Sequence, residues 1–297
     1  MKILVSLFLI ACTTVPVAAL AQVKSLVHKE EKRRYLVYTP ASYDRQPQKT
    51  YPVVFNFHGS GMTMAEQMLY TQMNRAADRH QFIVVYPAGV KQDWNVGFGM
   101  SYLDGTDDIG FTQALLAKLR QDYRVDDQRV YATGLSRGGF FALRIAAELP
   151  QLFAAVASVG APMPEPVIAH HTGKGKIGVL QLHGTADQVV AYAGKPTGYL
   201  SAEATYSYWL ERNGIGAGID AGIDAGKGQP ANIGADVTWQ EKGNGHQRVA
   251  LATIRDGGHT WPGADPFNIG LPLGKTTTTL DANETIWRFF KHHHLTR

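Results

Sequence analysis

The feature that most constrains this chain is a serine in a glycine-rich turn between an apolar run and a helical run. Residues 130–133 form the apolar run, Gly134-Leu135-Ser136-Arg137-Gly138 supplies the turn, and residues 140–149 have helical spacing. This strand–turn–helix context predicts a nucleophile elbow, in which a cramped backbone exposes the Ser136 hydroxyl. Gly134 and Gly138 fit that prediction because side chains there would collide across the turn. The alternative is an ordinary glycine-rich turn whose serine caps the helix.

Nearly continuous apolar runs alternate with helical patterns along the rest of the chain. Such runs are typical of buried parallel strands, and their alternation with helices predicts an α/β fold with a mostly parallel central sheet. The expected strands are a pair at a sheet edge within 26–38, then 53–57, 82–86, 129–133, 153–159, 177–182, 237–241 and 249–254. The expected helices are 64–80, one capped by Asp107-Asp108, 140–149, 201–212, and a last one from Asp281 through 290, where Asp281-x-x-Glu284 resembles a capping box. No linker divides the 297 residues, so we expect a single domain.

The first 21 residues have the composition of a secretory signal. Lys2 supplies a short positive region, residues 3–10 are apolar, and Ala19-Leu20-Ala21 fits the small-x-small rule for cleavage before Gln22. We therefore expect a signal peptide over 1–21 and a catalytic domain over 22–297 in a secreted or periplasmic protein.

The single cysteine lies inside this leader. Leu9-Ile10-Ala11-Cys12 resembles a lipoprotein box, an alternative that the short apolar run before Cys12 disfavours. After cleavage at Ala21 the chain would hold no disulfide, no thiol nucleophile and no cysteine metal ligand. We expect neither a metal nor another cofactor.

Charge and complexity add two further expectations. The net charge of +4 is too weak and too scattered to indicate nucleic acid, and no internal segment has the length and hydropathy of a membrane span. Residues 214–230 are of low complexity and repeat Gly-Ile-Asp-Ala at 218–221 and 222–225. Two copies do not make a solenoid, and their Asp spacing does not make a calcium repeat, so we expect a surface insertion.

A serine nucleophile needs an orienting acid, and the acid candidate is Asp187. It ends the run His183-Gly184-Thr185-Ala186-Asp187, just past the apolar run 177–182. Catalytic loops of an open α/β sheet collect after such strands. A buried carboxylate there would fix the tautomer of a catalytic histidine and stabilise its imidazolium. The alternative is an aspartate that caps a turn.

The base candidate is His259, in the sequence Gly257-Gly258-His259-Thr260-Trp261-Pro262-Gly263 after the apolar run 249–254. Of the eleven histidines, His259 combines a preceding strand with a position after the acid. The order Ser136, Asp187, His259 matches the order of the catalytic groups in α/β-hydrolases.

An oxyanion hole is expected from two backbone N–H groups. One belongs to Arg137, the residue after the nucleophile, and the other to Ser60, in the loop after the apolar run 53–57. Glycines on both sides of Ser60 let that backbone turn inward, and His58 is expected to be a structural hydrogen-bonding group rather than a second base.

These motifs together carry a family resemblance. The chain resembles the secreted polyhydroxybutyrate-depolymerase-like and feruloyl or acetyl-xylan esterases, of the carbohydrate esterase family 1 type, among the α/β-hydrolases. The matching pieces lie in the family's order within roughly 35–290: His58-Gly59-Ser60-Gly61, Tyr86-Pro87-Ala88-Gly89, Trp94-Asn95, Asp107-Asp108-Ile109-Gly110-Phe111, residues 134–139, residues 183–187 and residues 258–263.

The resemblance implies an α/β-hydrolase fold in which Ser136 is the nucleophile, Asp187 the acid and His259 the base. It also suggests that Trp94 and Trp261 contact the substrate. Two departures from the family are Arg137, where a small or amide side chain is more usual, and the insertion around 214–230. The Arg137 cation is expected either to favour anionic substrates or simply to lie on the surface of the first helical turn.

The implied function is a serine esterase for feruloyl or acetyl esters of plant polysaccharide. Depolymerisation of poly- or oligo-3-hydroxybutyrate is the alternative within the family, although no appended polymer-binding domain is visible in the sequence. A non-catalytic carbohydrate-binding protein on the same fold, and a peptidase or amidase, are alternatives of other classes.

Overall fold

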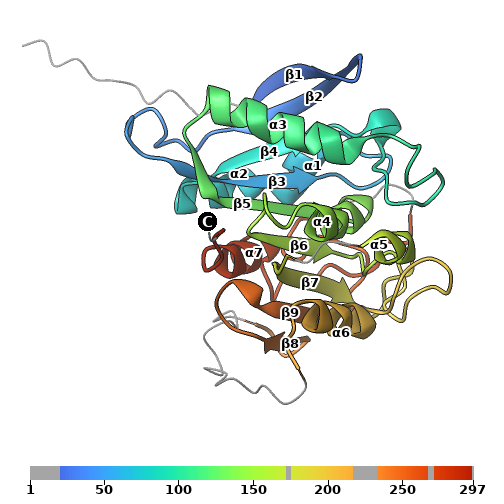
Figure 1. Cartoon of the computed structure of the whole chain (residues 1–297). Helices are drawn as coiled ribbons and strands as arrows, with labels where there is room; N and C mark the ends of the chain where they lie inside the picture. Colours follow the sequence, from blue (N-terminus) through green and yellow to red (C-terminus); the bar gives the residue numbers. More distant parts are fainter. Residues whose placement is uncertain (1–20, 172–174, 217–232, 267–270, 296–297) are drawn as a thin grey trace, which may run out of the picture.

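The computed structural model describes residues 21–171, 175–216, 233–266 and 271–295. Its described part is built on one nine-stranded sheet with the order β1-β2-β4-β3-β5-β6-β7-β9-β8 (Figure 1). The strands are β1 (Gln22–His28), β2 (Glu31–Tyr38), β3 (Tyr51–Phe57), β4 (Ile83–Pro87), β5 (Val125–Leu135), β6 (Ala155–Val159), β7 (Gly178–Gly184), β8 (Val237–Lys242) and β9 (Val249–Ile254). The six strands from β4 to β9 in that order pair in parallel, whereas β1, β2 and β8 pair antiparallel at the two edges. The expected α/β fold with a mostly parallel sheet is confirmed, as is the strand pair at one edge.

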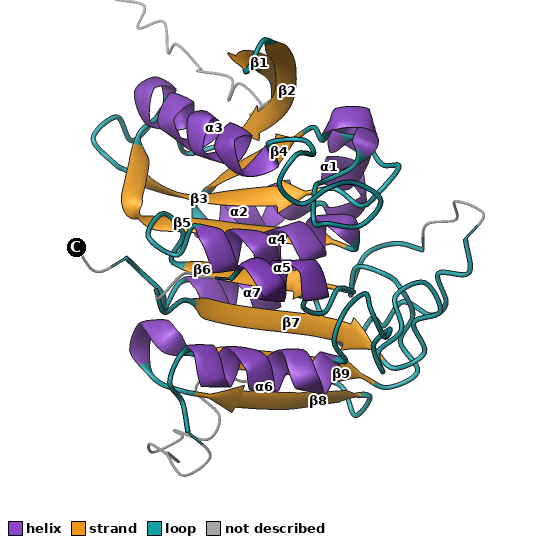
Figure 2. Cartoon of the chain, turned by 45° about the vertical axis from the view of Figure 1, so that its right-hand side comes forward, coloured by secondary structure: helices purple, strands orange, loops and turns teal. Residues whose placement is uncertain are grey.

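Helices cover both faces of the sheet (Figure 2). The helices are α1 (Met64–Thr71), α2 (Met73–His80), α3 (Asp108–Asp122), α4 (Arg137–Glu148), α5 (Glu165–His170), α6 (Ala202–Arg212) and α7 (Ala282–Phe290), with 3-10 turns at Val90–Gln92 and Gly245–Gln247. Helices α3, α4, α5 and α6 pack into one hydrophobic core, and α1, α2 and α7 into the other. Alternate side chains of β3 divide between the two cores, with Val53 and Phe55 in the first and Val54 in the second. Burial on both faces explains why the central strands are continuous apolar runs.

The helix expected over 64–80 is broken into two. Gln72 adopts a left-handed conformation (φ 50°) between α1 and α2. The Asn283 amide of α7 donates a 2.7 Å hydrogen bond to the carbonyl of Thr71, one of the carbonyls at the end of α1. The apolar spacing runs across this break, so the pattern did not reveal it.

Two caps match the sequence prediction only in part. Asp107 caps α3 by accepting from the Gly110 N–H at 2.9 Å. Asp281 caps α7, but the Glu284 carboxylate binds Arg79 and His80 on α2 instead of returning to the N-cap. The short helix α5 was not predicted, because six residues beginning near a proline carry too little periodicity.

The connections after the parallel strands form the edge that carries the candidate site. Residues 58–63 follow β3, residues 88–107 follow β4, the elbow follows β5, and Asp187 and His259 follow β7 and β9. Residues 1–20 and 217–232, which contain nearly all of the expected signal and most of the expected insertion, lie outside the described residues. Within the described ranges, no helix has the length and hydropathy needed to cross a membrane.

Candidate active site

The serine turn has the strained geometry of a nucleophile elbow. Ser136 has φ 55° and ψ −120°, a combination that non-glycine residues rarely adopt, and its side chain is partly exposed. A Cβ on Gly134 would lie 2.4 Å from the carbonyl carbon of Gly138, and a Cβ on Gly138 would lie 2.1 Å from the Phe57 carbonyl oxygen. Both glycines are therefore required by backbone packing, as the sequence predicts. Ser136 also makes no side-chain hydrogen bond to the helix N-terminus, so it is not an ordinary capping serine.

Asp187 and His259 form a buried hydrogen-bonded pair. His259 Nδ1 lies 2.7 Å from Asp187 Oδ2, and the other carboxylate oxygen accepts the N–H groups of Val189 and Val190 at 2.9 and 2.8 Å. Burial alone would raise the pKa of Asp187, but hydrogen bonds from His183, His259 and the Val190 N–H outweigh it and hold the pKa below its ordinary value. The carboxylate is thus ionised at neutral pH and can stabilise a neighbouring imidazolium.

Backbone hydrogen bonds join the loop that carries Asp187 to the loop that carries His259. The N–H of Thr185 donates to the carbonyl of Ile254, and the N–H of Ala186 donates to that of Gly257, both at 2.9 Å. A Cβ on Gly184 would lie 2.2 Å from the same Gly257 carbonyl oxygen. The close packing of the two turns fixes the separation between Asp187 and His259.

The end of β6 lies between Ser136 and the Asp187–His259 pair. The Ser136 N–H donates to the carbonyl of Val159 at 2.9 Å, and the next residue, Gly160, lies against the histidine. A Cβ on Gly160 would be 3.1 Å from His259 Nδ1 and 3.6 Å from Asp187 Oδ2. Among the described residues, Ser136 Oγ has no hydrogen-bond partner, so the serine–histidine bond is not closed here. Such bonds are often long before substrate binds.

The loop after β3 lies beside the elbow. A Cβ on Gly59 would be 3.7 Å from the Cβ of Ser136. The N–H groups of Ser60 and Arg137 donate to no oxygen in the described part of the chain, and both residues are solvent-accessible. The structure therefore brings the two expected oxyanion donors to the same edge as the nucleophile and leaves both N–H groups available.

His58 anchors the oxyanion loop from below. Its Nδ1–H donates to the Gly59 carbonyl at 2.8 Å, while Nε2 accepts the Gly89 N–H at 2.9 Å. Burial lowers the pKa of His58, which favours this neutral tautomer. Both ring nitrogens of His58 are hydrogen-bonded to backbone groups, so His58 is the structural group that the sequence indicates.

Both tryptophans proposed to contact substrate lie instead in the core. Trp94 and Trp261 have no solvent-exposed surface. The Trp94 indole N–H donates to the His58 carbonyl at 2.9 Å, and its ring stacks on Phe141. Trp261 points its indole N–H toward Asn283 of α7, 3.3 Å away. Each tryptophan packs on the core side of a loop of the candidate site. Its position in the sequence, close to that loop, did not reveal the direction of its side chain.

The Arg137 side chain is neither free nor simply a surface group. Its Nε lies 2.9 Å from Asp93 Oδ1, and its guanidinium carbon is 5.3 Å from the centre of the Phe98 ring. The ion pair neutralises the cation, whose expected roles were to favour anionic substrates or to lie on the surface, and it ties the elbow to the loop after β4.

Asp108, which the sequence indicates only as part of a helix cap, organises this loop. Asp108 is fully buried and accepts from Arg33 Nη2 and from the Asn95 N–H, both at 2.8 Å. Burial raises the pKa of Asp108, and the adjacent Arg33 cation opposes the rise. The sequence places both Asp107 and Asp108 at the helix cap, but only Asp107 caps, while Asp108 fixes the loop that carries Trp94.

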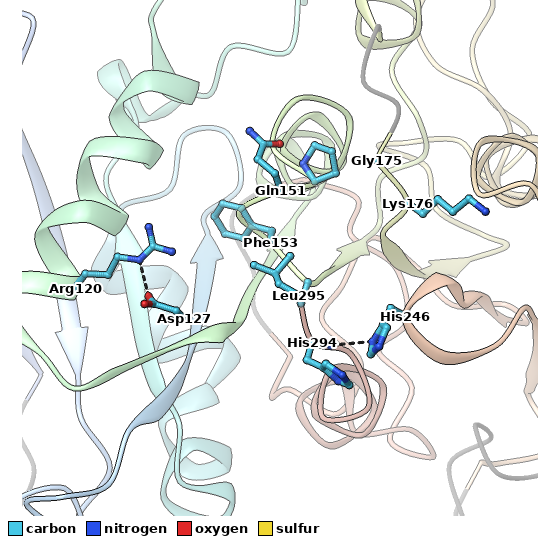
Figure 3. Close-up of a pocket in the computed structure, with 11 residues that line it drawn as sticks. Arg120, Asp127, Gln151, Phe153, Gly175, Lys176, His246, His294 and Leu295 are labelled. Carbon is cyan, nitrogen blue, oxygen red and sulfur yellow. Dashed lines mark hydrogen bonds and ion pairs between the residues drawn. The ribbon is translucent and has the colours of Figure 1, made fainter. Parts of the chain in front are cut away.

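A pocket of about 430 Å³ lies elsewhere in the molecule (Figure 3). Its lining includes Asp127 at the start of β5, Phe153 before β6 and Lys176 before β7. These positions are at the amino ends of the parallel strands, opposite the edge that carries Ser136. Arg120 in this pocket is paired with Asp127 at 2.7 Å. Across the described ranges, no cluster of three or more His, Cys, Asp or Glu side chains is arranged to hold a metal ion.

The fold and the site define an α/β-hydrolase with a serine elbow, and comparisons with known proteins agree. The model of the Esterase family, described as "Putative esterase", matches residues 28–253. A "Putative esterase NocK" of Nocardia uniformis subsp. tsuyamanensis is 30% identical over 253 residues, which are 79% of this chain and 72% of that protein. The chain therefore belongs to this esterase family and is a carboxylic ester hydrolase.

More distant relatives are named for particular esters. Feruloyl esterase B of Piromyces equi is 26% identical over 76% of this chain, a match that spans 42% of that protein. Among solved structures, an acetyl xylan esterase from Aspergillus awamori aligns with a TM-score of 0.58 and 15% identity over 80% of this chain and 94% of its own. A ferulic acid esterase from Anaeromyces mucronatus aligns with a TM-score of 0.53 and 18% identity, covering 82% of this chain and 85% of its own. At these identities the structures support the fold alone.

Proposed function

We propose that Ser136, His259 and Asp187 form a catalytic triad that hydrolyses carboxylic esters through an acyl-enzyme. The observation that carries the proposal is the 2.7 Å hydrogen bond between His259 and the buried Asp187, next to a strained serine elbow. His259 accepts the Ser136 proton as Oγ attacks the ester carbonyl, and Asp187 stabilises the imidazolium. The N–H groups of Ser60 and Arg137 bind the oxyanion. His259 then protonates the leaving alcohol, and water releases the acid.

The proposed substrates are feruloyl or acetyl esters of plant polysaccharide, and the proposed setting is secreted or periplasmic. Support for the substrate comes from the resemblance of the motifs and from the name of the relative in Piromyces. Support for export comes from the leader-like residues 1–21, with cleavage after Ala21 rather than lipidation at Cys12. The domain proper is then 22–297.

The test of the mechanism compares the wild type with Ser136→Ala. We expect the wild type to hydrolyse a chromogenic acetate ester and to be labelled by a fluorophosphonate probe, and the variant to lose both properties. Full activity in Ser136→Ala would remove the serine from the mechanism. An unlabelled, inactive wild type would instead indicate a binding protein on a hydrolase fold.

A small substrate panel tests the proposed ester. Methyl ferulate, acetylated xylan, 3-hydroxybutyrate oligomers and an anilide are compared by kcat/KM. Preference for the first two supports the proposal, preference for the oligomers would make the protein a depolymerase, and preference for the anilide would make it an amidase.

A further inference from the structure

A second histidine lies against the carboxylate of Asp187. His183 belongs to β7, and its side chain is fully buried. Its Nε2 is 2.9 Å from the carbonyl oxygen of Val190 and 3.3 Å from Asp187 Oδ2. Because a carbonyl oxygen only accepts hydrogen bonds, Nε2 must carry a hydrogen. That hydrogen is donated to the Val190 carbonyl, and Asp187 Oδ2 lies beside the same N–H group.

The rest of the His183 ring is also held. Its Nδ1 lies 3.3 Å from the Gln181 amide nitrogen, which faces it from the same side of β7 and can donate to it. The Tyr192 ring packs edge-on with its centre 5.5 Å from that of His183, and the Tyr192 hydroxyl is tied to Thr253 at 2.7 Å. Both ring nitrogens are thus engaged in one neutral tautomer, and the ring cannot turn without breaking a contact.

The carboxylate of Asp187 is consequently held on both oxygens. Oδ1 accepts two backbone N–H groups, and Oδ2 faces two imidazoles, those of His259 at 2.7 Å and His183 at 3.3 Å. The shorter distance makes His259 the principal partner of Oδ2. The His183 N–H group is a fixed, neutral neighbour at the side of Oδ2.

We propose that His183 is a positioning residue that fixes Asp187 Oδ2 in the orientation required by His259 and moderates the attraction of the carboxylate for the His259 imidazolium. The inference rests on the proposed function of Asp187 as the acid of the triad. His183 acts through Asp187 and does not touch the reacting atoms.

His183 has one charged neighbour among its contacts in the described part of the chain, the Asp187 carboxylate. Its other hydrogen-bonding and ring contacts there are with the Tyr192 phenol, the Gln181 amide and the Val190 carbonyl. A change in the charge balance of the triad caused by replacing His183 is therefore transmitted through Asp187.

The informative variants are His183→Leu and His183→Gln. Leucine fills a similar space without an N–H group, so Oδ2 loses the neighbouring N–H dipole and its charge acts more fully on His259. We expect the acidic limb of the kcat/KM profile, which reports His259, to move to higher pH by about half a pH unit. We also expect kcat to fall by about tenfold or more, because the carboxylate is less firmly oriented. Glutamine places an amide N–H near the position of Nε2. It should return the acidic limb and kcat most of the way to their wild-type values.

His293→Leu is the matched control. His293 is also fully buried and also bonds one ring nitrogen to a backbone carbonyl, that of Phe289 at 2.8 Å. It lies just after α7, away from the triad. Its replacement should leave the acidic limb and kcat at wild-type values, which separates the effect of losing a buried histidine from the effect of losing this one.

The experiment measures kcat/KM against pH for a chromogenic acetate ester and, independently, the titration of the His259 Nδ1 proton by NMR. A shifted limb and a shifted NMR titration in His183→Leu, both recovered in His183→Gln, support the proposal. Wild-type values in His183→Leu, or equal losses in His293→Leu, would overturn it. If the wild type hydrolyses no ester, the proposed function fails, while the NMR titration still decides whether His183 controls His259.

Discussion

A methyl group on Gly138 would lie 2.1 Å from the carbonyl oxygen of Phe57, the last residue of β3. This contact joins the elbow, which carries Ser136, to the strand that leads into the loop with Ser60. Both partners are backbone atoms, so neither can rotate aside. The separation between Ser136 and the expected oxyanion donor at Ser60 therefore depends on the absence of a side chain at residue 138.

Gly138→Ala tests that relationship. The added Cβ must push the elbow away from β3 by on the order of 1 Å, a displacement that typically reduces turnover by about 100-fold. We expect this loss in kcat for a chromogenic acetate ester, together with a lower Tm in thermal unfolding. Gly216→Ala is the control, because a Cβ there would meet nothing within 4 Å. A Gly138→Ala enzyme with wild-type kcat would show that the elbow tolerates the displacement.

Asp187→Asn removes the charge while retaining the shape. An asparagine amide cannot stabilise the imidazolium and can hold the wrong tautomer of His259, a change that costs a serine hydrolase about 10⁴-fold in kcat. We expect a loss of that order, measured by steady-state hydrolysis, with Asp44→Asn on the exposed surface as the control. A loss below about tenfold would mean that Asp187 caps a turn and takes no part in catalysis.

The pKa of Asp187 fixes the sign of a related pH effect. Because this pKa is held below its ordinary value, the folded protein binds fewer protons there than the unfolded chain. The contribution of ionised Asp187 to folding stability is therefore fully present above the ordinary pKa of an aspartate, about 3.9. It is lost as the pH falls through the pKa of Asp187 in the folded protein.

The positions of the strands along the chain, and of the candidate catalytic residues after them, could be predicted because they depend on local sequence patterns. The buried parallel strands require unbroken apolar runs, and the elbow at Ser136 requires glycines on both sides. Asp187 and His259 each follow such a run, and the topology of a parallel sheet brings those positions to one edge.

The features that were not predicted depend on the direction of side chains in three dimensions. Trp94 and Trp261 are close to the site along the chain, yet both point inward, where the Phe141 ring and the α7 amide receive them. Similarly, His183 lies four residues before Asp187 in the sequence. Its proposed role depends on the turn that brings the Val190 carbonyl to its ring, and spacing along the chain does not show that turn. Sequence spacing located the loops but did not indicate which face of each loop meets the substrate.

The Arg137–Asp93 pair predicts a change of specificity. In the wild type the guanidinium is neutralised by a carboxylate 2.9 Å from Nε. Asp93→Asn leaves the cation beside the elbow without its counterion, so an ester with a carboxylate near the scissile bond should bind more tightly. We expect KM to fall by about threefold to tenfold for an anionic ester and to stay unchanged for its neutral analogue. Arg137→Ala in the same background should abolish the difference, and equal KM changes for both esters would contradict the idea.

His293 predicts how folding stability depends on pH. Burial lowers its pKa to about 3, although the hydrogen bond to the Phe289 carbonyl opposes the shift. Its Nε2 is buried and has no hydrogen-bond partner in the described part of the chain, so a proton there would be unsatisfied. Between the unfolded pKa near 6.5 and the folded value, the unfolded chain binds a proton that the folded protein does not.

Stability attributable to neutral His293 is therefore fully present above about pH 6.5 and is lost as the pH falls, by about 1.4 kcal/mol per pH unit. His293→Leu removes this proton linkage and fills the site with an apolar side chain. Between pH 6.5 and 4.5 we expect the wild type to lose roughly 2 to 3 kcal/mol more unfolding free energy than the variant, as measured by urea denaturation. His170→Leu, at an exposed histidine, should retain the wild-type dependence. Parallel curves for the wild type and His293→Leu would show that His293 is protonated in the folded state, and the buried neutral tautomer would have to be abandoned.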